Sequence, residues 1–171
     1  LLKYHGIRVH LYDYELLSPK KWLNYTLMDL YYCYLKQKFL PNINAVALLR
    51  PVLAYRLTRD LVDDPNLMAD LPKELTRAEL IFIPVNDNNV HTKAAEIHWS
   101  LLVYSRTMGK FYHYDPLGKH NLAMAKMVHK NLTGLLRIGD TEFVSLKVPN
   151  QKASFDCGIY VIMFTEALLR R

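Results

Sequence analysis

The sequence has no long apolar run, and this absence excludes a membrane-spanning helix. No stretch approaches the roughly 18 uncharged apolar residues that such a helix needs. The N-terminal stretch LLKYHGIRVHLYDYELL also lacks the charged-then-apolar layout of a secretory signal peptide. We therefore expect an intracellular protein, cytoplasmic or nuclear, with no membrane partner.

Cysteine is scarce, with Cys33 and Cys157 the two in the chain. Neither belongs to a C-x-x-C pair, which disfavours both a disulfide framework and a zinc site. The count alone also permits a single bridge, but a reducing compartment fits better. Cys33 falls in a run of aromatic residues and is expected to be a packed thiol.

The chain also lacks a Gly/Ser-rich linker, an internal repeat and a dense basic run. Its 171 residues, 51% of them hydrophobic, suit one globular domain with a sizeable core. The formal charge of +6 comes from scattered Lys and Arg, as on a solvated surface. An acidic partner or a nucleic acid is the less favoured explanation of this charge, and we expect no nucleic-acid partner.

Hydrophobic periodicity predicts an α+β fold, in which a sheet of about five strands packs between helices. The expected strands are residues 7–12, 78–85, 98–104, 111–114 and 142–149, with a short strand or loop from residue 44. The expected helices are residues 18–39, with Ser18 as N-cap and Pro19 in the first turn, a helix opened by Pro51, residues 119–137, and a buried helix over residues 156–171. The polar stretch over residues 60–76 favours a loop or short helical turns.

One predicted hairpin carries a polar residue at each end. The stretch HWSLLVYSRTMGKFYHYDP begins with His98, and Asp115 follows its return strand. Antiparallel pairing brings both residues to the same edge of the sheet. His98 can then act as general base and later as general acid, while Asp115 holds the imidazole in the required tautomer.

A nucleophile is offered by a second stretch, QKASFDCGIYVIMF, which begins at Gln151. Cys157 lies at the predicted start of the last helix, where the helix dipole favours a thiolate. Gly158 is expected to leave room for a substrate carbonyl at the sulfur. Gln151 can aim an amide N–H at the developing oxyanion, together with the backbone N–H of Cys157.

Each of these residues also has an ordinary structural explanation when it is taken alone. A histidine on a strand is commonly a hydrogen-bonded core residue, an aspartate before proline is commonly a turn residue, and a Cys-Gly pair at a helix start is commonly packing. Their mutually consistent positions favour a thiol hydrolase. If the three side chains do not meet, the chain is an ordinary α/β domain with a few buried polar residues.

Three stretches, IHWSLLVY, FYHYDP and QKASFDCGIYVIMFTEALL, together resemble the Ulp/sentrin-specific cysteine proteases, which remove ubiquitin-like modifiers. The family pattern is His-Trp, then Asp at the end of the next strand, then Gln five residues ahead of Asp-Cys-Gly. The resemblance runs from about Tyr12 to Arg170 and is greatest to the deneddylase branch, which acts on Nedd8. It implies that residues 1–171 form a single catalytic domain with the papain-like fold of the Ulp type.

The resemblance also implies roles for individual residues. His98, Asp115 and Cys157 would be the catalytic triad, and Gln151 the oxyanion donor. Trp99 would cover a tunnel through which the Gly-Gly tail of the modifier reaches the thiol. The other residues implied to bind the substrate tail or to flank it are Trp22, Asn24, Tyr25, Asn86, Asp87 and Asn88, and the loop over residues 86–97 is expected to close over the tail.

One position departs from the family pattern. The sequence WLN at residues 22–24 matches the start of the family's WLND motif, but Tyr25 replaces the Asp, which is expected to engage a basic residue near the modifier's tail. Asp13, Glu15 and Asp29 are candidates to compensate. The modifier preference is therefore the part of the resemblance that this substitution affects.

The resemblance implies a thiol protease or isopeptidase that cleaves after the Gly-Gly of a ubiquitin-like modifier, Nedd8 first. Its partners would be the modifier and its conjugates, the protein a monomer, and no cofactor or metal is implied, because thiol acyl transfer needs none. A SUMO- or ubiquitin-directed protease of the same family remains an alternative. An acetyltransferase of the same clan and an inactive modifier-binding module are less favoured, because no acetyl-CoA region is recognisable and all four catalytic positions are filled.

Overall fold

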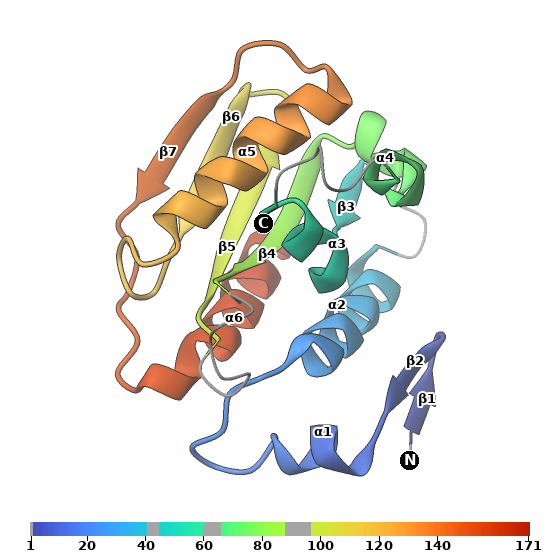
Figure 1. Ribbon diagram of the computed structural model, residues 1–171, viewed down its shortest axis with the longest axis vertical. Coiled ribbons are helices and arrows are strands. Elements are labelled where there is room, and N and C mark those ends of the chain that lie inside the picture. The colour runs from blue at the N-terminus through green and yellow to red at the C-terminus, as the bar shows by residue number, and fades with distance from the viewer. Residues whose placement is uncertain (1, 41–44, 60–65, 88–96) are drawn as a thin grey trace.

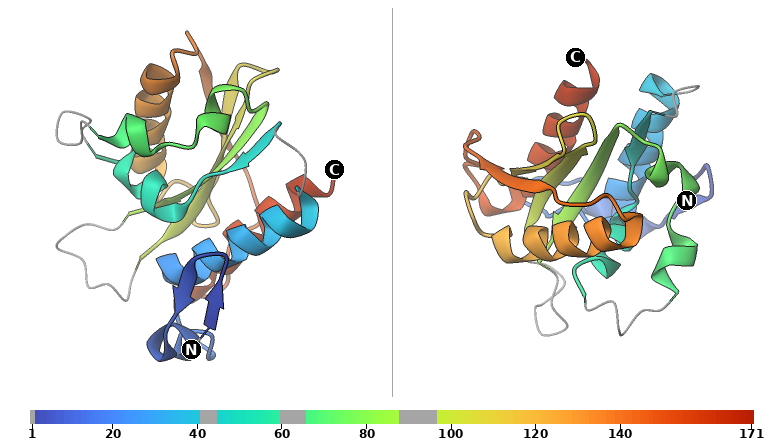
Figure 2. Two further views of the ribbon diagram at one scale, coloured as in Figure 1. Left: turned by 90° about the vertical axis from the view of Figure 1, so that its right-hand side faces the viewer. Right: turned by 90° about the horizontal axis from the view of Figure 1, so that it is seen from above.

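The computed structural model describes residues 2–40, 45–59, 66–87 and 97–171. Asn88 and most of the predicted tail-covering loop lie outside these ranges. The described elements form three layers, with a sheet between two sets of helices (Figures 1 and 2).

The central sheet has five strands and is mixed, as predicted. In spatial order they are β3 (Val46–Leu48), β4 (Leu80–Asn86), β5 (Trp99–Ser105), β6 (Lys110–Tyr114) and β7 (Glu142–Leu146). The two outer pairings are parallel and the two inner pairings antiparallel. Strands β4 and β5 are buried almost throughout, since helices cover both faces of the sheet.

Two sets of helices cover the sheet. On one face lie α3 (Pro51–Arg56), α4 (Leu67–Asp70), a 3₁₀ turn (Lys73–Thr76) and α5 (Leu122–Leu136); on the other lie α2 (Tyr25–Phe39) and α6 (Cys157–Leu169). Alternate residues of β4 serve the two cores: Ile81 and Ile83 pack in the first, and Phe82 packs in the second. This arrangement confirms the α+β class and its sheet between helices.

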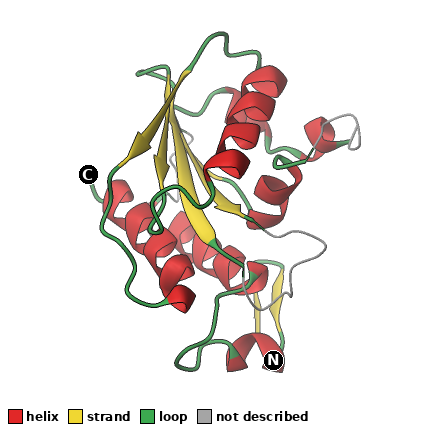
Figure 3. Ribbon diagram, turned by 60° about the vertical axis from the view of Figure 1, so that its left-hand side comes forward, coloured by secondary structure: helices red, strands yellow, loops and turns green. Residues whose placement is uncertain are grey.

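The N-terminal part of the chain differs from the prediction. The strand expected over residues 7–12 ends at Val9 and pairs with β1, so that β1 (Leu2–Tyr4) and β2 (Ile7–Val9) form a small separate sheet (Figure 3). A short helix, α1 (Leu11–Glu15), follows. It buries Asp13 and exposes Leu11 and Tyr12, the reverse of the usual apolar pattern. The Asp13 carboxylate accepts hydrogen bonds from the His10 N–H and the Asn24 side chain, which compensate its burial.

The predicted N-cap of the next helix was also wrong. Helix α2 begins at Tyr25, and Asn24 caps it by accepting a hydrogen bond from the Leu27 N–H at 3.0 Å, so Ser18 and Pro19 lie outside the helix. The chain before Asn24 lies outside the helix, and its Leu23 carbonyl oxygen accepts a hydrogen bond from the Trp99 indole.

Helix α6 was expected to be buried, but one side of it is exposed. Ile159 is 45% exposed and Met163 58% exposed, because α6 lies in an outer layer with one side facing solvent. Across the described ranges, no helix combines the length and the apolar character that crossing a bilayer requires.

Candidate active site

The hairpin of β5 and β6 brings His98 and Asp115 together, as predicted. His98 directly precedes β5 and Asp115 directly follows β6, and the antiparallel register places both at one end of the sheet. His98 Nε2 lies 2.7 Å from Asp115 Oδ1, and both side chains are buried. The imidazole of His98 and the carboxylate of Asp115 therefore have the geometry of a base and its orienting group.

Asp115 is held as a carboxylate. Burial alone would raise its pKa, but hydrogen bonds from His98, from the Asn121 N–H and from the Leu117 N–H outweigh burial and lower the pKa to about 2. A carboxylate can only accept hydrogen bonds, so the proton in the bond to His98 resides on Nε2. The other imidazole nitrogen, Nδ1, is buried without a hydrogen-bond partner among the described residues.

The Cys157 thiol lies against the chain on both sides of His98. Cys157 is the first residue of α6. Its Sγ donates to the Ile97 carbonyl oxygen at 3.6 Å and accepts a hydrogen bond from the backbone N–H of Trp99. Ile97 and Trp99 are the residues before and after His98. The structure thus places the thiol against the main chain on both sides of His98.

The electrostatics of the thiol differ from the prediction that the helix start would leave its pKa lowered. Burial raises the pKa of Cys157, which has no exposed surface. The N–H groups of Trp99 and Gly158 lower it in part, and the negative charge of Asp87 raises it further. The net effect is a protonated thiol, which becomes a nucleophile only by giving its proton to a nearby acceptor.

Gly158 also has a packing role that the sequence did not indicate. A Cβ at this position would lie 3.0 Å from the Cβ of Leu23. The Trp99 indole donates to the Leu23 carbonyl oxygen at 2.8 Å. Gly158 therefore lets the chain at Leu23 lie between the start of α6 and the start of β5, which fixes Cys157 against β5.

Gln151 is near the other site residues but its amide is engaged locally. Its Nε2 donates to the carbonyl oxygens of Ala153 and Ser154, at 3.0 and 3.1 Å. Its backbone N–H donates to the Pro116 carbonyl oxygen at 3.0 Å, which ties the segment before Cys157 to the residue after Asp115. The oxyanion role of Gln151 stays a prediction, and it requires the amide to turn away from these carbonyls.

The residues expected to line the tail channel include several that are packed inside the protein. Trp99 and Asn86 have no exposed surface, because they pair across β4 and β5 at a covered end of the sheet. Tyr25 donates its hydroxyl to Asn86 Oδ1 at 2.7 Å and packs edge-on against Trp99. Asn24 caps α2, and Trp22 lies half-buried against Phe155. Asn86 and Trp99 thus form an inner wall and not an exposed lining.

Two of the three acidic residues considered as substitutes for the missing Asp are occupied. Asp13 has no exposed surface and binds Asn24, and Asp29 is paired with Arg50. Glu15 is exposed at the end of α1. Of the three carboxylates, that of Glu15 is the one directed to solvent, where a basic residue of a partner can reach it.

Sequence reasoning missed the polar residues that surround the pair. Asp87, expected only in a loop beside the tail, accepts the His98 N–H at 2.7 Å and lies 3.1 Å from His120 Nε2. The His120 ring stands edge-on to that of His98, with centroids 4.9 Å apart. Asn121 donates its side-chain amide to the His98 carbonyl oxygen. It was missed because an Asn just before a helix normally indicates a cap, and no pattern of spacing distinguishes a capping Asn from one that bonds to another element.

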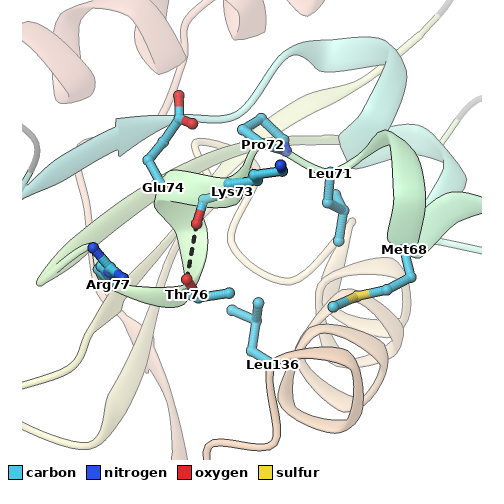
Figure 4. A pocket seen from close by; sticks show the side chains of 8 residues that line it. All are labelled: Met68, Leu71, Pro72, Lys73, Glu74, Thr76, Arg77 and Leu136. Carbon is cyan, nitrogen blue, oxygen red and sulfur yellow. Dashed lines mark hydrogen bonds between the residues drawn. The ribbon is translucent and has the colours of Figure 1, made fainter.

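A surface pocket of about 550 Å³ lies at the opposite end of β4, between α4, the 3₁₀ turn and the end of α5 (Figure 4). No cysteine, histidine or aspartate lines it. Its one internal hydrogen bond in Figure 4 joins the Thr76 hydroxyl to the Lys73 carbonyl oxygen at 2.8 Å. The pocket therefore offers no thiol or imidazole and is separate from the residues around His98.

Comparisons with known proteins agree with this arrangement. Residues 21–171 match the family described as Ulp1 protease family, C-terminal catalytic domain. The chain is 35% identical to human sentrin-specific protease 8, over 91% of this chain and 74% of that protein, and 27% identical to NEDD8-specific protease 1 of Arabidopsis thaliana, over 95% and 72%. Among solved structures, the yeast Ulp1 protease domain in complex with Smt3, the yeast ortholog of SUMO, has the same fold, with a TM-score of 0.72 and 19% identity over 99% of this chain and 76% of that one.

Proposed function

The chain belongs to the Ulp1 family of cysteine proteases of ubiquitin-like modifiers, and we propose that it cleaves after the C-terminal Gly-Gly of Nedd8, in precursors or in conjugates. In this proposal residues 1–171 act as one catalytic domain and as a monomer. The observation that carries it is the buried His98–Asp115 pair with the Cys157 thiol against the residues on both sides of His98.

The proposed reaction begins with transfer of the thiol proton to His98 Nδ1, the imidazole nitrogen without a hydrogen-bond partner among the described residues. The thiolate then attacks the carbonyl carbon of the terminal glycine, and the oxyanion that forms accepts hydrogen bonds from the Cys157 N–H and the amide of Gln151. The imidazolium of His98 gives its proton to the leaving amine. Water, activated by His98, hydrolyses the remaining thioester and restores the thiol.

Asp115 supports both proton transfers. Because its pKa is lowered to about 2, it stays charged throughout the pH range in which histidine titrates. Its carboxylate holds Nε2–H and stabilises the imidazolium, which directs Nδ1 to the thiol. This offsets the burial that raises the pKa of Cys157, since an imidazolium beside the sulfur favours the thiolate.

The preference for Nedd8 is supported by the names of the relatives, several of which are NEDD8-specific proteases. A SUMO-directed activity remains the competing proposal, because solved structures of similar fold include SUMO proteases. A narrow channel for Gly-Gly selects by shape and excludes side chains next to the scissile bond. The body of the modifier then provides the affinity that separates one modifier from another.

The test uses probes with a thiol-reactive group at the C-terminus of Nedd8, ubiquitin and SUMO. We expect the wild type to form a covalent adduct with the Nedd8 probe, read as a gel shift, and Cys157→Ala to form none. Cys33→Ala is the matched control, because Cys33 is a partly exposed thiol in α2, outside the site. It should react as the wild type does.

Each outcome assigns the activity differently. A Cys157-dependent adduct with the SUMO or ubiquitin probe alone would keep the mechanism and overturn the Nedd8 preference. The absence of any adduct would contradict the protease proposal, and an acetyl-transfer assay with acetyl-CoA would then be the next measurement. An unchanged cleavage rate on substituting His98 by Ala would contradict the proposed triad.

A further inference from the structure

Asn121 occupies a helix-cap position but does not cap the helix. It directly precedes α5, where an asparagine side chain normally accepts a hydrogen bond from the first turn, and no such bond is present. The side chain is instead completely buried, and its Nδ2 reaches two strands. Nδ2 lies 3.0 Å from the His98 carbonyl oxygen, 3.3 Å from that of Val85 and 3.2 Å from Ser100 Oγ.

The main chain of the same residue holds the other half of the pair. The Asn121 N–H donates to Asp115 Oδ2 at 2.9 Å, so Asn121 is bonded to both His98 and Asp115. We propose that Asn121 is a positioning residue that sets the relative placement of these two side chains. The inference rests on the proposed function, since it takes His98 as the base and Asp115 as its orienting group.

The hydrogen bonds around His98 explain why this residue needs an additional support. His98 precedes the regular part of β5, and Asp87 binds its main chain from one direction: the His98 N–H donates to Asp87 Oδ1 at 2.7 Å. The Asp87 N–H in turn donates to the His98 carbonyl oxygen, but this bond is longer, at 3.3 Å. The amide of Asn121 provides the shorter bond to this carbonyl and joins it to β4 through Val85.

The network continues behind the pair without adding a charge. Ser100 Oγ lies 3.0 Å from His113 Nε2, and burial lowers the pKa of His113 to about 4, so this histidine is neutral near pH 7. His113 therefore places no positive charge beside Asp115 near pH 7. Among the described residues, the titratable groups near the His98 side chain and main chain are Asp87, His113, Asp115 and His120, and the Cys157 thiol bonds to the neighbouring Ile97 carbonyl oxygen.

The chain contains a close match to Asn121 in a place that has no contact with the site. Asn131, on α5, is also buried, and its Nδ2 also donates to two main-chain carbonyl oxygens, those of Leu57 at 2.9 Å and Arg59 at 2.8 Å. Loss of either amide removes the same kind of hydrogen bonds from the interior. Only the loss of Asn121 should change the chemistry.

The experiment compares Asn121→Ala, Asn121→Asp and Asn131→Ala in a Cys33→Ala background, which leaves Cys157 as the one thiol. Two readouts are taken: cleavage kinetics with a Nedd8 fusion, and the pH dependence of Cys157 alkylation by iodoacetamide, which needs no modifier. We expect both Asn121 variants to lose about ten- to a hundredfold in kcat with KM nearly unchanged, because a small misplacement of a base is costly and Asn121 does not reach the surface.

The alkylation profile adds a signature that a purely structural role would not give. A looser His98–Asp115 pair stabilises the imidazolium less, so the thiolate should form at higher pH in the Asn121 variants. Asn131→Ala should lose stability in denaturant and keep the wild-type kcat and profile. Asn121→Asp keeps the size of the side chain, and so tests the amide donor if Asn121→Ala does not fold.

Two results would separate the failure of this inference from that of the proposed function. If His98→Ala abolishes cleavage while both folded Asn121 variants keep the wild-type kcat and alkylation profile, the positioning role is overturned. An equal loss of kcat in Asn131→Ala would also overturn it, as a general effect of stability. If His98→Ala itself changes neither cleavage nor alkylation, the proposed triad fails, and the inference fails with it.

Discussion

Replacing Gly158 by alanine should weaken the protein at the contact that holds Cys157 in place. The added Cβ would lie 3.0 Å from Leu23 Cβ, 3.2 Å from its Cδ1 and 3.3 Å from its Cγ. The nearest of these atoms is next to the main chain, and the Leu23 carbonyl is held by the Trp99 indole, so the side chain cannot simply turn aside. Overpacking of this kind costs about 1–3 kcal/mol.

A second effect acts in the opposite direction and can be measured separately. Alanine is favoured over glycine inside a helix by about 0.5–1 kcal/mol. Gly134 in α5 shows this effect alone, because a Cβ there would meet nothing within 4 Å. Gly134→Ala should therefore stabilise the protein by about that amount, whereas Gly158→Ala should destabilise it by up to about 2.5 kcal/mol after the gain is subtracted.

The assay is urea denaturation of both variants, combined with the rate of Cys157 alkylation. Gly158→Ala should also alter alkylation, since displacement of Leu23 moves the start of α6 relative to β5. Leu23→Ala in the same chain removes the contacts with Cγ and Cδ1 and should moderate the effect of the added Cβ. If Gly158→Ala proves as stabilising as Gly134→Ala, the close approach of Leu23 is not the reason that position 158 is a glycine.

Three further predictions concern the polar groups of the site. Asp115→Asn should keep the fold near pH 7 but reduce kcat by about ten-thousandfold in steady-state kinetics, because an amide no longer favours the required imidazole tautomer. The same variant should lack about 2 kcal/mol of stability that the wild type has above pH 3.8 and loses as pH falls toward about 2. Unfolding at a series of pH values measures this difference. Burial keeps His113 neutral in the fold, so the free energy of unfolding should decrease as pH falls from 6.5 to about 4. His113→Gln should flatten this part of the plot of unfolding free energy against pH. An unchanged slope would mean that His113 is not the group responsible. Trp99→Phe leaves the buried Leu23 carbonyl without its indole donor and should cost about 1–3 kcal/mol in denaturation, and a variant as stable as the wild type would show that water or another donor replaces the bond.

Much of the fold could be predicted because its strands carry clear patterns. The apolar run that forms β4 and the hairpin of β5 and β6 are set by local sequence, with Gly109 in the left-handed region at the turn (φ +61°). The start of α2 could not be predicted in this way. Ser18 followed by Pro19 is the better local signal, and the helix begins instead at Tyr25, after a segment whose carbonyl bonds to Trp99, a residue far away in the sequence.

The site shows the same division between local and distant causes. The meeting of His98 and Asp115 follows from hairpin register, which sequence spacing reveals. The raised pKa of Cys157 does not, because the helix start is a local feature while burial depends on the packing of α6 against β5. The packing role of Gly158 and the role of Asn121 were missed for a similar reason, since their partners, Leu23 and the His98 carbonyl, come from other elements.

The packing around Leu23 also gives the protein an optical property. The chain has two tryptophans, and they lie on the two sides of this contact: Trp99 is completely buried with its indole N–H bonded to the Leu23 carbonyl, and Trp22 lies half-buried against Phe155, two residues before Cys157. Tryptophan fluorescence therefore comes from two residues at the Leu23 contact. Emission from Trp99 should be blue-shifted and insensitive to added quencher, while that of Trp22 should respond when a tail occupies the site. Binding and release can thus be followed in stopped flow on the unlabelled protein, with Trp22→Phe as the variant that removes the signal.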